Sequence, residues 1–208
     1  MMLAASRFVL VGMCAVTLVA CQSDDKAPQP RYVSNSFNSP ASAPAPPTSG
    51  VVRSGQSAQV AGDSRYFIEF RSRYALSYGH SYVVFGRADA KGAMINPEVA
   101  GLHPASTSTV PYVLGHFVPV PAETGWSDGD LEEEYRSASW RVMLNESEYR
   151  KAVADIRRIQ HSTKTWSATV YNCNAFVASI ASAMGLKTPG IWLRPQQFIT
   201  KLREINGG

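Results

Sequence analysis

A cysteine in the C-terminal third of the chain stands where a helix is predicted to begin. Cys173 lies within YNCNAF, residues 171–176, and apolar residues follow it at helical spacing until Gly185 supplies a stop. A thiol in the first turn of a helix lies among unpaired backbone N–H groups at the positive end of the helix dipole, and both favour the thiolate. Because the thiolate is the nucleophilic form of cysteine, this position predicts a catalytic nucleophile; a small buried core residue is the alternative.

A cysteine nucleophile requires a base, and the chain has four histidines. His80 is the best placed, because it follows Gly79 and precedes an apolar run, Ser81–Phe85, that predicts a central strand covered on both faces. A polar group at the end of such a strand can face a cleft, although a histidine that only forms a hydrogen bond there is the alternative. His116 is predicted on the next strand, where it could orient the imidazole of His80 as the third member of a triad.

The other two histidines are assigned to different places. His103 precedes Pro104 in a segment rich in small and polar residues, which predicts a surface or substrate-rim position. His161 ends a predicted helix, where a cation interacts favourably with the dipole. The sequence contains neither C-x-x-C nor H-x-x-x-H, so it predicts no zinc site, and we expect neither a metal nor a cofactor.

The N-terminus predicts export. Arg7 is the only charged residue before position 24, and the apolar run Phe8–Ala20 is too short to span a bilayer well. The run ends in LVAC, residues 18–21, with small residues before the expected cleavage point. Residues 1–20 are therefore predicted to be a signal peptide; an ordinary signal with a chance cysteine, or an uncleaved anchor, is the alternative.

The LVAC ending resembles a bacterial lipobox. The resemblance implies cleavage before Cys21 and a diacylglycerol on its sulfur, so that the exported protein is held by lipid at a membrane, facing the periplasm in a Gram-negative cell. Cys14 would leave with the signal peptide, so Cys173 would have no partner for an internal disulfide. In an oxidising compartment this leaves a thiol that is buried, paired with another molecule, or reactive.

Residues 21–62 are predicted to be the lipidated cysteine and a disordered tether, because residues 34–50 are almost entirely Ser, Pro, Ala, Asn and Thr. About 40 residues of flexible chain span on the order of 35 Å, enough to hold a domain away from a membrane. Residues 63–208 are predicted to form one domain. The formal net charge is +4 and the basic residues are scattered, which argues against a nucleic-acid partner.

The domain is predicted to be α+β, an antiparallel sheet packed against helices. Strands are predicted over residues 66–70, 81–85 and 139–144, and a further strand within 113–120. Helices are predicted after Asn145, from Cys173 and from Pro195, with Asn145 as an N-cap and Glu148 at the third helical position. The acidic run 128–134 predicts a solvated loop that leads into a short helix.

A Gly-His pair that opens an apolar strand, followed much later by Asn-Cys-Asn-x-Phe at a helix start, is similar to the circularly permuted NlpC/P60 papain-like superfamily. The similarity covers residues 66–185 and is closest to the LRAT-like and PPPDE-like branches, in which histidine precedes cysteine. It implies a papain-like fold with Cys173 as nucleophile, His80 as base and His116 as the third polar group.

The resemblance also implies attack of the Cys173 thiolate on an acyl carbon, with backbone N–H groups around Asn172 and Asn174 stabilising the oxyanion. Ala175 stands where those branches often carry a histidine, so their substrate class is not transferred. Wall peptides and the acyl chains of envelope lipids would be within reach, and the tether slightly favours wall peptide. The alternative is a non-catalytic, lipid-anchored binding or structural module of the envelope.

Overall fold

The computed structural model describes residues 65–75 and 78–208. The predicted signal peptide, Cys21 and the predicted tether lie outside the described residues. Within these two ranges, none of the helices has the length and apolar character that crossing a bilayer requires.

The main sheet is antiparallel and has the strand order β3-β2-β1-β6. Its strands are β1 (Tyr66–Arg73), β2 (His80–Ala88), β3 (Met94–Gly101) and β6 (Arg136–Leu144). The two central strands, β1 and β2, are buried along nearly their whole length, which confirms the central strand predicted over 81–85. Their register places His80 opposite Arg73.

A second, smaller sheet has the order β4-β5-β7. It consists of β4 (His103–Pro104), β5 (Val120–Glu123) and β7 (Thr165–Trp166). Strand β4 begins two residues after β3 ends, so His103 is carried to the end of the main sheet at which β2 begins.

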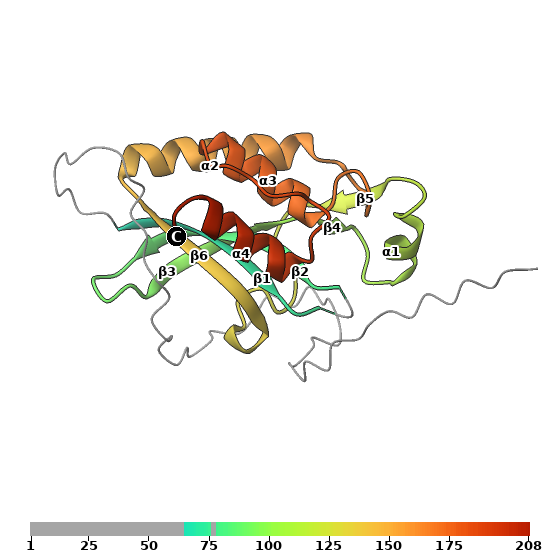
Figure 1. Cartoon of the computed structure of the whole chain (residues 1–208), viewed down its shortest axis with the longest axis horizontal. Helices are drawn as coiled ribbons and strands as arrows, with labels where there is room; N and C mark the ends of the chain where they lie inside the picture. Colours follow the sequence, from blue (N-terminus) through green and yellow to red (C-terminus); the bar gives the residue numbers. More distant parts are fainter. Residues whose placement is uncertain (1–64, 76–77) are drawn as a thin grey trace, which may run out of the picture.

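Three helices cover one face of the main sheet, as Figure 1 shows. They are α2 (Glu146–Ser162), α3 (Cys173–Ala183) and α4 (Pro195–Ile205). A short helix, α1 (Val110–Leu114), lies apart from them at one end of the molecule, and a 3-10 helix, η1 (Glu133–Tyr135), precedes β6 (Figure 1). The predicted α+β class is confirmed.

The alternation of side chains along the strands divides the core into two parts. Val83 and Phe85 of β2 face the helical layer and pack in one cluster with Phe176 of α3. Tyr82 and Val84 face the opposite side and belong to a smaller cluster, which loop residues including Trp126 partly cover. Each face of β2 is therefore buried by a different set of elements.

The helix starts were predicted correctly. The Asn145 side chain accepts a hydrogen bond of 2.9 Å from the backbone N–H of Glu148, whose carboxylate accepts one of 3.0 Å from the Asn145 N–H. Helices α3 and α4 begin at Cys173 and Pro195, as expected.

The strand predicted within residues 113–120 was wrong. The chain instead forms α1 and a following turn, and β5 begins only at Val120. Pro111 lies in the first turn of α1, where its fixed φ suits a helix and its missing N–H removes no hydrogen bond. Periodicity alone cannot tell whether a short apolar run is a helix or a strand. Here Pro111 favours the helix.

Candidate functional site

Helix α3 places Cys173 at its first position. The Asn172 side chain caps the helix by accepting a hydrogen bond of 3.1 Å from the N–H of Ala175. Its amide nitrogen donates to the carbonyls of Ala168 (3.1 Å) and Ile191 (3.3 Å), so the cap is tied to two neighbouring segments. Residues 172 and 173 are thus fixed at the helix start that the sequence predicted.

The next residue, Asn174, ties α3 to the main sheet. Its Oδ1 accepts a hydrogen bond of 2.7 Å from Oγ of Ser81 in β2, and both side chains are buried. Its Nδ2 donates to the carbonyls of Ile191 (3.0 Å) and Leu193 (2.7 Å). The Asn174 side chain therefore has a positioning role, while its backbone N–H lies at the thiol.

The thiol of Cys173 is only 6% exposed, and this burial raises its pKa. Hydrogen bonding by the side chain and backbone of Ser81, and by the backbone N–H groups of Asn174 and of Cys173 itself, acts in the opposite direction. The helix start was expected to favour the thiolate. In the structure, desolvation of the buried sulfur outweighs that effect and favours the neutral thiol. The resting thiol is protonated at neutral pH.

His80 is the first residue of β2 and is buried. Its ring stacks on that of Tyr82 with centroids 5.6 Å apart, on the sheet face opposite to the one on which Ser81 meets α3. Burial lowers the pKa of His80 well below its usual value, and the positive charge of Arg73 lowers it further. The imidazole is therefore neutral at neutral pH, and it is a weaker base than an exposed histidine.

The structure brings His80 and Cys173 to the same end of β2 without joining them. Ser81, whose groups reach the thiol, directly follows His80 in the chain. Within the described ranges no hydrogen bond links the ring to the thiol, and Nε2 of His80 is buried without a partner. Catalytic hydrogen bonds in free enzymes are often long and shorten only when substrate binds.

His103 lies beside His80, which corrects its predicted surface position. It is buried in β4, and its ring meets that of His80 edge to face with centroids 6.3 Å apart. Its Nδ1 lies 3.1 Å from the carbonyl of Pro104, which can only accept, so Nδ1 carries the proton. The Nε2 of His103 is then an acceptor, and it too is buried without a partner.

Gly101, at the end of β3, makes room for this pair of imidazoles. A Cβ atom at this position would lie 2.8 Å from Nε2 of His80 and 3.1 Å from Cβ of Tyr82. Any side chain at residue 101 would displace the His80 ring.

His116 does not occupy the place predicted for it. It is exposed on the turn after α1, and its Nδ1 lies 3.0 Å from the carbonyl of Tyr112. The strands that flank β2 are β1 and β3, so the predicted strand that would have carried His116 to His80 is absent from this sheet. His161 is exposed in the last turn of α2, as predicted.

A buried ion pair supports the His80 side of the sheet. Oδ1 of Asp130 accepts a hydrogen bond of 2.6 Å from Nε of Arg73, and its Oδ2 accepts from the N–H (2.8 Å) and Oγ (3.0 Å) of Ser127. The Tyr82 hydroxyl donates to the backbone carbonyl of Asp130 at 2.7 Å. The acidic run thus leads into the predicted short helix, but Asp130 is wholly buried instead of solvated.

Residues 125–129 carry the Gly-x-Ser-x-Gly pattern that is typical of a serine-hydrolase elbow. Its serine, Ser127, lies in the loop between β5 and η1, is buried, and bonds to Asp130 and Arg73. A serine-hydrolase elbow needs a strand–turn–helix around the serine, which this loop does not provide.

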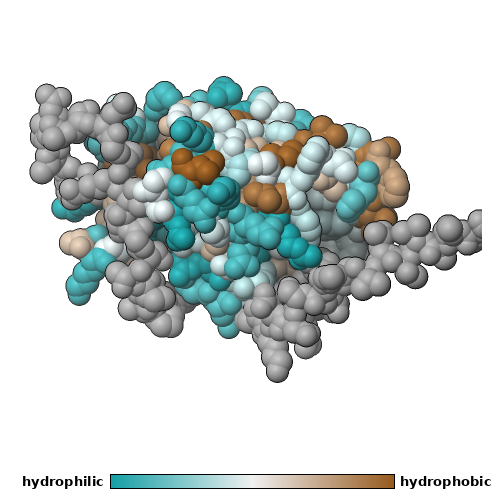
Figure 2. Space-filling view, viewed as in Figure 1, coloured by the Kyte–Doolittle hydropathy of each residue, from teal (hydrophilic) through white to brown (hydrophobic). Residues whose placement is uncertain are grey.

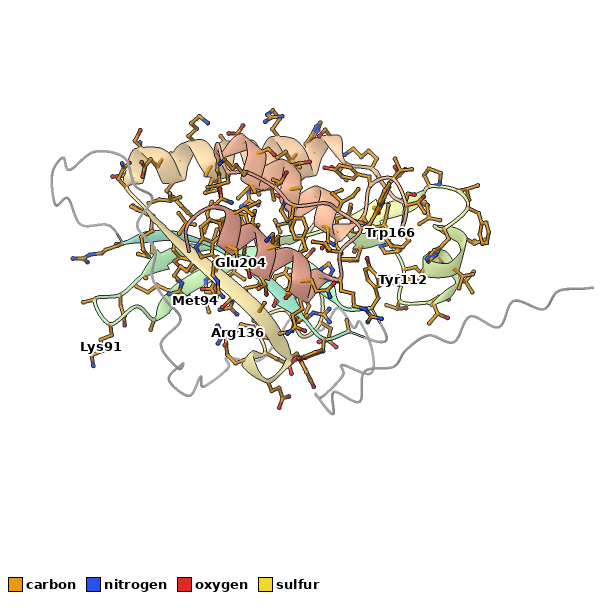
Figure 3. All side chains as sticks on the ribbon, viewed as in Figure 1. Lys91, Met94, Tyr112, Arg136, Trp166 and Glu204 are labelled. Atoms are coloured by element: carbon orange, nitrogen blue, oxygen red, sulfur yellow. The ribbon has the colours of Figure 1, made fainter. Side chains whose placement is uncertain are left out.

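Two tyrosines that the sequence did not single out lie near the thiol. Burial raises the pKa of Tyr78 and of Tyr112, and negative charge on Cys173 would raise both further. Tyr112, on α1, meets Trp166 of β7 edge to face with centroids 5.6 Å apart, and Figure 3 shows the two rings side by side. Only the fold brings these residues to Cys173, so no sequence pattern identifies them.

Residues 65–75 and 78–208 contain no group of three or more His, Cys, Asp or Glu side chains that could hold a metal ion. Cys173 is a free cysteine.

No protein-family model matches this chain, and comparison with curated proteins and with solved structures found no match.

Proposed function

We propose that this chain is a lipid-anchored envelope protein whose domain performs cysteine-dependent acyl transfer, as a hydrolase or acyltransferase on a papain-like, permuted NlpC/P60-type fold. The observation that carries the proposal is the junction of α3 with β2. The hydrogen bond from Ser81 to Asn174 holds the first turn of α3, with Cys173, against the end of β2 that bears His80.

In the proposed reaction the neutral imidazole of His80 takes the thiol proton through an intervening water molecule, because the two side chains lie on opposite faces of β2, as the Cys173 sulfur attacks the acyl carbon of an amide or ester. A carbon–sulfur bond forms, and the carbonyl π electrons move to oxygen, where backbone N–H groups of residues 173 and 174 donate. When the tetrahedral intermediate collapses, the amine or alcohol leaves with the proton from His80. Water or another acceptor then attacks the thioester, and its proton returns to the sulfur through His80.

His103 is the group best placed to orient His80. Its Nε2 is an acceptor, so a hydrogen bond from Nε2–H of His80 would satisfy two buried atoms that otherwise have no partner. That bond would fix the proton of His80 on Nε2 and leave Nδ1 as the base. His103 therefore takes the positioning role first assigned to His116.

Burial of both groups disfavours a preformed ion pair between a Cys173 thiolate and a His80 imidazolium. Burial raises the pKa of Cys173, while burial and Arg73 lower that of His80, so both groups rest in their neutral forms. Proton transfer is then expected to accompany attack on the substrate instead of preceding it.

A non-catalytic, lipid-anchored binding module is the second candidate, and the low exposure of the thiol favours it. In that case Cys173 is a packing residue between α3 and β2, and His80 and His103 are buried residues with a structural role only.

The rate of Cys173 alkylation as a function of pH, measured on the full chain in detergent, distinguishes the two. For an enzyme, native Cys173 reacts, and His80→Ala and His103→Ala slow the reaction, whereas the exposed His161→Ala leaves it unchanged. Cys173→Ser identifies the background from any other thiol. If native Cys173 reacts only after unfolding, or at a rate indifferent to His80, the chain is a binding module.

A further inference from the structure

Exposed apolar side chains gather at the end of the molecule that carries α1. Phe117 is 82% exposed, Trp192 77% and Val170 72%. Figure 2 shows hydrophobic residues at this end, with separate ones over the middle of the same face. We call this region the α1 surface; it comprises Val110, Val113, Leu114, Phe117, Val170 and Trp192.

Three separate segments form the α1 surface, and hydrogen bonds hold them together. The N–H of Ala168 donates to the carbonyl of Gly115 at 2.9 Å, which places the 167–170 loop against the end of α1. The indole N–H of Trp192 donates to the carbonyl of Thr169 at 3.0 Å, which adds the third segment. The exposed side chains therefore belong to one continuous surface.

The chemistry of the α1 surface matches that of a lipid bilayer at its headgroup boundary. Residues 105–122, 165–172 and 188–193 contain no Asp, Glu, Lys or Arg. Trp192 is an amphipathic ring of the kind enriched at membrane interfaces, and its N–H is already bonded internally, so insertion leaves no donor unsatisfied. Lys164 and Arg194 adjoin two of these segments, where cations meet lipid phosphates favourably.

The chain that precedes the domain supplies the reason to expect a bilayer. From Cys21, the proposed lipidation site, 44 residues lead to Arg65. The tether predicted from the composition of this segment would span on the order of 35 to 40 Å, which would keep a bilayer within reach of an anchored domain. A weakly apolar surface is then sufficient for docking, because the lipid is at high effective concentration.

We propose that the α1 surface docks on the lipid bilayer, with its apolar side chains inserted between headgroups. Tyr112, on the inner side of α1, lies near Cys173. Docking would hold the thiol end of the domain at the membrane. This interaction rests on the proposed lipid anchor at Cys21 but not on the proposed acyl transfer.

Tryptophan quenching tests the proposal on the full, lipidated chain in vesicles of phosphatidylethanolamine and phosphatidylglycerol with brominated acyl chains. Trp140 and Trp166 are buried, whereas Trp192 is exposed. We expect Trp192 to be quenched, and Trp192→Phe to lose most of the quenching. The lipid anchor is the same in every variant, so it cannot produce this difference.

Charged substitutions on the α1 surface should abolish the quenching of Trp192. Val113→Asp with Phe117→Asp is the first variant, and Val170→Asp is the second in case the double variant unfolds. Ile95→Asp is the matched control, because Ile95 is an exposed apolar residue on β3, near the opposite end of the sheet. Melting temperatures establish that each variant is folded.

Three outcomes would overturn the proposal: no quenching in the wild-type chain, equal quenching in Trp192→Phe, or quenching that the charged variants leave intact. A dimer seen by light scattering, dissociated by Phe117→Asp and accompanied by unquenched Trp192, would instead assign the surface to a second copy. Alkylation of Cys173 is measured separately, so failure of docking and failure of the proposed chemistry are distinguishable.

Discussion

Oγ of Ser81 donates a hydrogen bond of 2.7 Å to Oδ1 of Asn174, and both groups are buried. The donor directly follows His80 in β2, and the acceptor directly follows Cys173 in α3. This single bond therefore sets the spacing between the two elements that carry the candidate nucleophile and base.

Ser81→Ala should destabilise the fold and the thiolate together. The substitution leaves a buried amide oxygen unpaired, which costs about 1 to 3 kcal/mol in the free energy of unfolding. Loss of the polar Ser81 hydroxyl beside the sulfur should also raise the pKa of Cys173 further. Urea unfolding and the pH dependence of alkylation measure the two effects, and Ser182→Ala, on the exposed side of α3, should change neither.

The three histidine variants should separate the catalytic and structural assignments. His80→Ala is expected to reduce turnover or Cys173 alkylation by about 100- to 10,000-fold, the usual contribution of a general base. His103→Ala should act in the same direction but less strongly, because it acts through His80. His116→Ala should have no effect, since His116 is exposed and bonded only locally. A loss in His116→Ala equal to that in His103→Ala would contradict the placement of His103.

Burial of His80 should make the fold less stable in mild acid. Its pKa is lowered on folding, so below about 6.5 the unfolded chain binds a proton that the folded chain refuses. Its contribution to stability is complete above that pH and is lost as the pH falls toward its folded-state pKa. The free energy of unfolding, measured in urea at pH 7.5 and 5.5, should fall less in His80→Gln than in the wild type. An equal fall in both proteins would mean that His80 does not titrate differently on folding.

The Arg73–Asp130 pair should matter far more for stability than the ion pairs on α2. Asp130→Asn leaves a buried guanidinium without its counter-ion, which costs about 3 to 5 kcal/mol. The exposed pair of Arg150 and Glu146 is the control, because Glu146→Gln should cost no more than about 1 kcal/mol. Chemical denaturation compares the two variants, and similar losses would show that the Asp130 carboxylate is replaceable.

Local signals in the sequence predicted the helix starts well, because each depends on a few neighbouring residues. The cap at Asn145, the start at Cys173 and the proline at 195 all lie where the sequence places them. The apolar residues at the start of β1 and along β2 also predicted these strands, whereas the buried polar second half of β1, Arg71–Arg73, carries no such signal.

The error over the third histidine has a physical cause in β3. None of the first five residues of this strand is buried, and Pro97 and Glu98 are among them, so this part carries no apolar pattern. The apolar residues 113–120 therefore look more like the strand beside β2 than β3 does. That prediction puts His116 next to His80, whereas in the structure His103 lies there. Strand pairing is non-local, and one sequence does not reveal it.

The separation of Ser81 from Asn174 along the chain also bears on how the protein matures. The two residues are 93 positions apart, so Cys173 becomes buried only after most of the domain has emerged and a long loop has been ordered. Before that, Cys173 is an ordinary accessible thiol, and in the oxidising compartment that the proposed export implies it would be open to sulfenic acid formation or to mixed disulfides. Completion of folding therefore protects the sulfur, and slower folding would leave a larger fraction of chains with an oxidised Cys173.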